Sequence, residues 1–110
     1  SIGHALETAV LIELERRRCD VTYVRTHAGH EVDFLARGPL GATDLIQVCA
    51  DASDPATAER ELRSLVESAA LFPGARLRLL TLTRDGVPAD VPAGIIVQPA
   101  YEWMLDEPAA

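Results

Sequence analysis

The sequence predicts an α+β fold in which a mixed β-sheet is flanked by helices, and three observations support this class. Apolar residues recur at helical spacing at the start of the chain and again in its middle. Three short strand-like segments lie between these two helices, and a near-continuous apolar segment, Leu77 to Thr83, follows the second helix. Hairpin strands followed by a helical crossover to a further strand produce a mixed sheet with helices packed against it.

The first half of the chain is predicted to contain one helix and then three strands. Residues 3–18 predict a helix because their apolar side chains fall on one arc of the helical wheel (Leu6, Val10, Leu11 and Leu14). Strands are predicted over Val21–His27 and His30–Arg37, joined at Ala28-Gly29, where glycine permits a tight reversal. After a turn over residues 38–41, Asp44–Ala50 is the third predicted strand.

The second half is predicted to contain a helix, two strands and a final helix. Asp54 followed by Pro55 is typical of a helix start, with the aspartate as N-cap. This helix is expected to bury one stripe and to end at Phe72-Pro73-Gly74 (the stripe is Ala58, Leu62, Leu65, Val66 and Ala69). Leu77–Thr83 is expected to lie inside the sheet, because it is apolar on both faces. A polar loop then leads to a short strand at Ile95–Gln98 and to a helix opened by Pro99.

The composition excludes several classes of protein. With 110 residues, the chain is predicted to form one domain over residues 1–106 with a tail over 107–110, excised from a longer protein. Its formal net charge is -7 and its ten basic residues are all arginines, which disfavours nucleic-acid binding by this domain alone. The two cysteines suit a reducing cytoplasm, and no apolar run is long enough to span a membrane. The sequence is compatible with a homo-oligomer of this domain.

Glu7 is the first candidate functional residue. On the helical wheel it lies within the apolar arc, between Val10, Leu11 and Leu14. An inward carboxylate must be paired, protonated or bound to a cation, because burying an unpaired charge is costly. The alternative is a partly hydrated glutamate that the helix dipole favours in the first turn. The wheel does not decide between these two interpretations.

Asp33 is the second candidate, within Glu31-Val32-Asp33-Phe34. Strand alternation predicts that Glu31, Asp33 and Leu35 share one face of the sheet, with Val32, Phe34 and Ala36 on the other. Acidic residues are depleted in strands, so Asp33 between two apolar neighbours requires an explanation. Either it faces solvent on an open sheet surface, or it belongs to a site.

Gln47 and Cys49 lie on one face of the next predicted strand. If the turn centres on Leu40, paired residue numbers sum to about 80, so Asp33 faces Gln47 and Glu31 faces Cys49. With Glu7 arriving from the first helix, two carboxylates and an amide oxygen form a site of hard oxygen ligands. Such a site suits Mg²⁺ or Mn²⁺.

These residues together resemble the PD-(D/E)xK, restriction-endonuclease-like superfamily. Within it, the chain is similar to the C-terminal domain of unknown function that is appended to predicted AAA-type P-loop ATPases of bacteria and archaea. The resemblance covers nearly the whole chain. It is carried by Gly3-His4-Ala5-Leu6-Glu7, Tyr23-Val24-Arg25-Thr26, Gly29-His30-Glu31-Val32-Asp33-Phe34 and Leu45-Ile46-Gln47-Val48-Cys49.

The resemblance implies a role for four residues. Glu7 matches the helical acid that helps to hold the metal, and Asp33 matches the principal metal-binding aspartate. Gln47 stands where a second acid is usual, and Cys49 stands at the lysine position. In active members that lysine orients the attacking water and stabilises charge on the phosphate. A cysteine does neither well, the chain has no lysine elsewhere, and Arg25, Arg76 or Arg78 would be poor proton carriers in its place.

Three functions follow as expectations. The first is a nuclease-fold accessory domain of an ATP-binding protein, with a degenerate site, acting in protein or substrate contact beside an N-terminal ATPase domain. The second is a metal-dependent DNA nuclease assisted by that domain. The third is an interaction domain in which Glu7 and Asp33 are structural and pair with Arg25 or another arginine.

Overall fold

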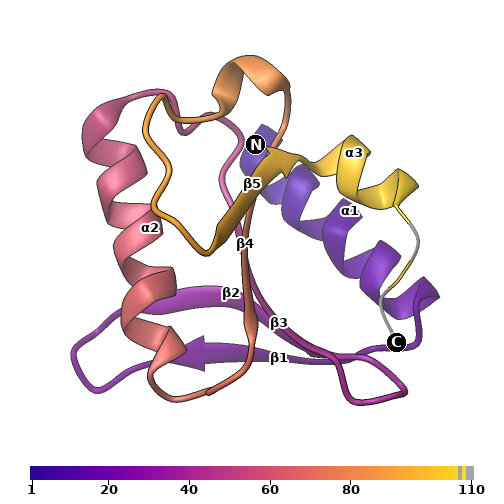
Figure 1. Cartoon of the computed structure of the whole chain (residues 1–110). Helices are drawn as coiled ribbons and strands as arrows, with labels where there is room; N and C mark the ends of the chain where they lie inside the picture. The colour runs from indigo at the N-terminus through magenta and orange to yellow at the C-terminus, as the bar shows by residue number, and fades with distance from the viewer. Residues whose placement is uncertain (107, 109–110) are drawn as a thin grey trace.

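The computed structural model describes residues 1–106 and 108, which form a five-stranded mixed sheet with three α-helices packed against it (Figure 1). A single-turn 3₁₀ helix over Arg84–Gly86 lies in a segment that was predicted to be a loop. The predicted mixed α+β class is therefore confirmed. The elements in chain order are α1 (Ile2–Arg16), β1 (Asp20–Arg25), β2 (Glu31–Arg37), β3 (Thr43–Val48), α2 (Pro55–Ala69), β4 (Arg76–Thr81), β5 (Ile95–Pro99) and α3 (Ala100–Leu105).

The strands lie side by side in the same order as in the chain, from β1 to β5. β1, β2 and β3 pair antiparallel through short turns, whereas β3, β4 and β5 pair parallel, with α2 as the crossover between β3 and β4. β4 has a neighbour on each side, as its apolar composition predicted. The β2–β3 register pairs residues whose numbers sum to 80, from Phe34 with Ile46 to Arg37 with Thr43, as a turn at Leu40 predicted.

The sheet separates two apolar cores. α1 and α3 cover one face, and α2 covers the other (Figure 1). Val48 and Trp103 belong to the first core and Leu45 and Leu65 to the second. Because β3 alternates between the two cores, both faces of its C-terminal end lie under helices. This end is where the candidate site lies.

Two predicted details of the helices are wrong. α1 ends at Arg16 rather than Arg18, because Arg18 has a left-handed backbone with φ of 63° and cannot continue the helix. In α2 the stripe against the sheet includes Ser64 and Ser68, whereas Val66 is 50% exposed and lines a surface groove. Of the predicted tail, Pro108 lies in the described part of the chain, and Glu107, Ala109 and Ala110 lie outside it.

A β-bulge in β2 overturns the predicted assignment of its faces. Thr22 pairs with Leu35 and Val24 pairs with Val32, so Asp33 and Phe34 together lie opposite a single residue, Tyr23. As a result Val32 and Leu35 contact the α2 core, whereas Phe34 contacts the α1 core. Asp33 and Leu35 therefore do not share a face through regular alternation. Asp33 lies opposite Val32, on the side of α1, where Glu7 is its neighbour.

Gly86, the last residue of the 3₁₀ helix that follows β4, supplies a test of packing. A Cβ at this position would lie 2.9 Å from the Ala50 carbonyl oxygen and 3.2 Å from the Asp51 Cα, which are backbone atoms with little freedom to move. We expect Gly86→Ala to lower the free energy of unfolding by about 1–3 kcal/mol. Gly3→Ala is the matched control, because a Cβ in α1 meets nothing within 4 Å there and should stabilise the helix by up to about 1 kcal/mol. Urea unfolding of both variants measures the difference, and equal effects would contradict the packing argument.

Candidate functional site

The structure brings Glu7 of α1 close to Asp33 of β2. Glu7 follows the buried Leu6 and is itself only partly exposed. Burial raises the pKa of Asp33 most, and the nearby carboxyl of Glu7 raises it further. Two carboxyl groups in contact share a proton or a cation, because their charges repel each other. The acid of the opening helix and the acid of the second strand thus lie near each other on the same side of the sheet.

Asp33 is held by the ends of two strands that separate at this point. The last β2–β3 backbone pair is Phe34 with Ile46, and beyond it side chains take over the hydrogen bonding. The Asp33 Oδ2 accepts a hydrogen bond of 2.8 Å from the Val48 N–H. Burial is the largest cause of a rise in the pKa of Asp33 to about 7, and the charges of Glu7 and Glu61 add to it against the effect of the Val48 N–H. Near neutral pH this carboxyl is thus poised between its two protonation states.

Gln47 bridges the separated strands. Its Oε1 accepts a 3.0 Å hydrogen bond from the Asp33 N–H, and its Nε2 donates to the Glu31 carbonyl oxygen at 3.3 Å. The same Nε2 donates to Glu61 Oε2 at 2.5 Å. The side chain is buried, with 6% exposed. Gln47 therefore fixes the Asp33 backbone, and its oxygen, predicted as a metal ligand, already accepts one hydrogen bond.

Glu61 of α2 is a site residue that sequence reasoning missed. It is bonded to Gln47 and its charge acts on both Asp33 and Cys49. The signal was present, because Glu61 lies three residues after Ala58 and four before Leu65, on the stripe that faces the sheet. A charged residue inside an apolar stripe is informative in the same way as Glu7 in α1.

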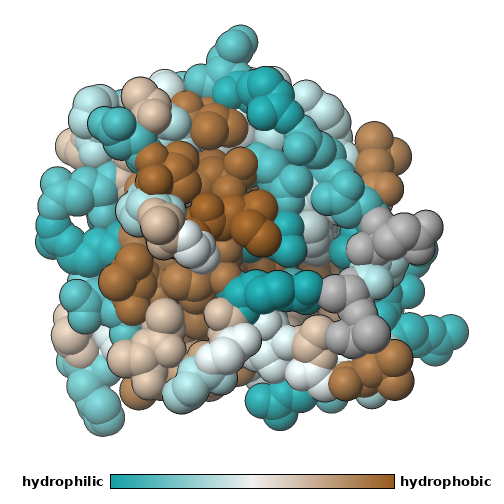
Figure 2. Space-filling model, viewed as in Figure 1, coloured by the Kyte–Doolittle hydropathy of each residue, from teal (hydrophilic) through white to brown (hydrophobic). Residues whose placement is uncertain are grey.

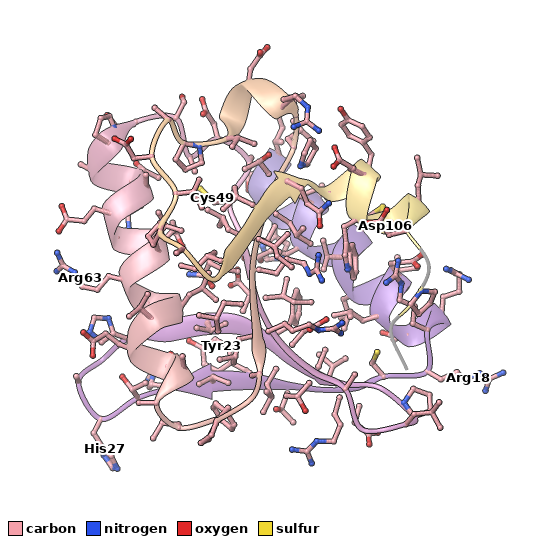
Figure 3. The ribbon with its side chains drawn as sticks, in the orientation of Figure 1. Arg18, Tyr23, His27, Cys49, Arg63 and Asp106 are labelled. Carbon is pink, nitrogen blue, oxygen red and sulfur yellow. The ribbon has the colours of Figure 1, made fainter. Side chains whose placement is uncertain are left out.

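Cys49 lies just beyond β3, beside α2 (Figure 3). Burial and the charge of Glu61 raise the pKa of its thiol, so it is neutral at physiological pH, and its Sγ lies 3.4 Å from the Asp51 carbonyl oxygen. The expectation that Glu31 faces Cys49 is wrong. Glu31 is exposed and pairs with Arg25 at 2.7 Å, because the β2–β3 pairing has already ended.

The arginines predicted as substitutes for the lysine are not at this site. Arg25 forms an ion pair with Glu31. Arg76 lies beside Asp44 at the start of β3, at the opposite end of that strand from Cys49, and Arg78 donates its hydrogen bond to Gln98 of β5. The arginine that reaches the site is Arg60 of α2, whose Nη2 lies 3.7 Å from Glu61 Oε1. The positive charge of Arg60 also lowers the pKa of the Cys49 thiol, against the larger effects of burial and Glu61. The Arg60 side chain is 69% exposed.

The three histidines do not gather into a site. His27 lies at the tip of the β1–β2 hairpin and points away from the molecule (Figure 3). Across residues 1–106 and 108, no group of three or more His, Cys, Asp or Glu side chains is arranged to hold a metal ion. Magnesium in proteins often takes only one or two carboxylates and keeps several waters. The donors of Glu7 and Asp33 therefore fit a hydrated magnesium ion, but not a fully protein-ligated one.

A separate groove of about 660 Å³ lies between α2 and the loop before β5. It is lined mainly by apolar side chains, including Leu62, Val66 and Val91, and Figure 2 shows them gathered on this face of the molecule. None of the four site residues predicted from the sequence lines it. In the described part of the chain, no helix has the length and apolar character that crossing a bilayer requires.

Comparisons of the chain with protein-family models, with curated proteins and with solved structures found no match.

Proposed function

We propose that this chain is a nuclease-fold accessory domain with a degenerate active site, which binds a divalent cation weakly and acts in protein or substrate contact. The observation that carries the proposal is the closeness of Glu7 and Asp33, whose carboxyl groups act on each other, together with a neutral thiol at the position of Cys49. The order of a helix, three antiparallel strands, a crossover helix and a parallel strand is compatible with the PD-(D/E)xK core. In this proposal the domain belongs to a longer ATP-binding protein with an N-terminal P-loop ATPase domain.

The charge distribution supports binding of a cation. Glu7 and Asp33 are both partly buried and repel each other, and among the described residues neither makes an ion pair with an arginine (the ion pairs are those of Glu13, Glu31, Asp44, Glu59, Glu61 and Glu102). This argues against the interaction-domain interpretation, in which an arginine neutralises them. A divalent ion would relieve the repulsion and replace the shared proton. Glu61 adds negative charge but is bonded to Gln47.

Thermal unfolding in Mg²⁺ or Mn²⁺ tests the cation site. We expect millimolar Mn²⁺ to raise the unfolding temperature, and to raise it more at pH 8 than at pH 5.5, because the ion competes with the proton on Asp33. Asp33→Ala should abolish the rise, and Asp85→Ala, an exposed acid in the 3₁₀ helix, should leave it unchanged. No rise in the parent chain, or an equal rise in Asp33→Ala, would show that the acid pair holds no cation.

A metal-dependent nuclease is the second candidate, and Arg60 is the observation that favours it. Its guanidinium is the cationic group beside Glu61 and Cys49, where it could stabilise charge on a phosphate. If this candidate is right, plasmid cutting in Mn²⁺ by the chain, alone or with its ATPase domain, falls at least tenfold in Arg60→Gln. Arg63→Gln is the control, because Arg63 lies one turn along α2, points outward and pairs with Glu59 (Figure 3). Absence of cutting in every metal supports the accessory domain.

A further inference from the structure

A polar pocket that includes neither Glu7 nor Asp33 lies beside the C-terminal end of α1. It is a cavity of about 100 Å³ between the end of α1, the start of β3, the start of β4 and α3. Three arginines line it, from two places in the fold: Arg17 directly after α1, and Arg76 and Arg78 of β4. Trp103 of α3 forms part of its wall. None of these residues takes part in the proposed function.

Two of the three arginines already make an ion pair, Arg17 with Glu13 and Arg76 with Asp44. Arg76 Nε donates to Asp44 Oδ1 at 2.5 Å, so one aspartate is already paired. Arg17 uses its Nε on Glu13 and its Nη2 on the carbonyl oxygens of Trp103 and Asp106, and its guanidinium lies 4.6 Å from the centre of the Trp103 ring. Arg17 is thereby held rigidly against the pocket wall.

Arg78 is the group without a counter-charge of its own. It is 9% exposed, and its one hydrogen-bonding partner among the described residues is a neutral amide, Gln98 Oε1, at 2.6 Å from Nη1. Its Nε is buried and has no hydrogen-bonding partner within residues 1–106 and 108. Burial, with the charges of Arg76 and Arg17, lowers the pKa of Arg78, and Asp44 and Asp106 oppose this only in part. A buried guanidinium in this position is stabilised by an anion.

We propose that this pocket binds the phosphate group of a small molecule. Three guanidinium groups that meet from the end of α1 and from β4 suit a tetrahedral oxyanion with several acceptor oxygens better than a planar carboxylate. The volume of about 100 Å³ admits a group of that size and little more. Arg17 and Arg76 then supply peripheral charge, and Arg78 supplies the buried donor.

Trp103 gives a direct readout, because it is the sole tryptophan of the chain and lines the pocket. The intact chain is titrated with inorganic phosphate in EDTA at constant ionic strength, and tryptophan emission is followed. We expect a saturable change with a half-point in the millimolar range or below. The half-point for acetate should lie at a concentration at least several-fold higher than that for phosphate. Chloride should give no saturable change in tryptophan emission. A chloride curve equal to the phosphate curve, or an acetate half-point at or below that of phosphate, would overturn the assignment.

Two variants test Arg78 in different ways. Arg78→Met should raise the half-point at least tenfold, and Arg63→Gln, on the outer side of α2, should leave it unchanged. If Arg78→Met fails to fold, Gln98→Glu keeps Arg78 and places a carboxylate at the position of Gln98 Oε1, so it should weaken phosphate binding by a similar factor. Unchanged phosphate binding in both variants would sink the proposal. Because the titration contains EDTA, its outcome is independent of the cation site.

Discussion

Replacing Asp33 with asparagine is expected to stabilise the chain at pH 8 and to have almost no effect at pH 4. Asparagine retains an oxygen that accepts from the Val48 N–H but removes the charge that burial and Glu7 disfavour. A change from 3.8 in the unfolded chain to about 7 in the folded one corresponds to roughly 4 kcal/mol at ~1.36 kcal/mol per pH unit. Because the group is partly hydrated, we expect a gain of about 2–3 kcal/mol at pH 8.

The dependence of the free energy of unfolding on pH shows the direction of this effect. The folded chain holds the Asp33 proton more tightly than the unfolded chain. The stabilising contribution of protonated Asp33 to the free energy of unfolding is therefore fully present below about pH 4. It is lost as the pH rises toward about 7. Urea unfolding in EDTA between pH 4 and pH 8 should therefore show a decline in the parent that is largely absent in Asp33→Asn.

Asp51→Asn is the control with the opposite sign. The hydrogen bonds from the Ser53 hydroxyl and N–H lower the pKa of Asp51, so its charged form is favoured in the folded chain. This variant should lose stability at neutral pH, and the loss should vanish as the pH falls through the pKa of Asp51. If the free energy of unfolding changes in the same direction in both variants at pH 8, the change in Asp33→Asn does not come from the charge of Asp33.

The sequence could predict the elements of the fold because each carries its own local signal. Asp54 before Pro55 marks the start of α2, and the Asp54 side chain does accept from the Thr57 N–H. Glycine at the predicted hairpin reversal has φ of 87° at Gly29. The β2–β3 register followed from the centre of one turn. These are local preferences or simple counting along the chain.

The site was harder to predict, because its geometry depends on departures from regular structure. The bulge at Asp33 and Phe34 changes which face each side chain occupies, and no residue type marks it. The end of the β2–β3 pairing removes Glu31 from the site, and the packing of α2 brings in Glu61. Only the tertiary fold determines these contacts. What periodicity alone does show is that Glu7 and Glu61 each lie within the apolar stripe of a helix.

Replacing Gln47 with glutamate is expected to destabilise the chain by about 3 kcal/mol or more at pH 8. A glutamate has no N–H with which to replace the 2.5 Å hydrogen bond that Gln47 Nε2 donates to Glu61 Oε2. Its carboxylate also brings a further negative charge beside Asp33 and Glu7. The loss should shrink toward pH 4, where the carboxyls are protonated. If Glu7 and Asp33 hold a cation, Mn²⁺ should recover part of the loss, because a third carboxylate then becomes a ligand. Thermal unfolding at both pH values, with and without Mn²⁺, measures this.

Gln98→Glu is the matched control, because Gln98 is also a buried glutamine, with 7% exposed. Its Oε1 accepts from a guanidinium, Arg78 Nη1, so the same substitution here creates an ion pair in place of a repulsion. The contact it loses is a weak one, 3.5 Å from Gln98 Nε2 to Glu102 Oε1. We expect its stability at pH 8 to stay within about 1 kcal/mol of the parent or to rise. Equal losses in both variants would mean that burial of a carboxylate, rather than the sign of the surrounding charge, sets the cost at Gln47.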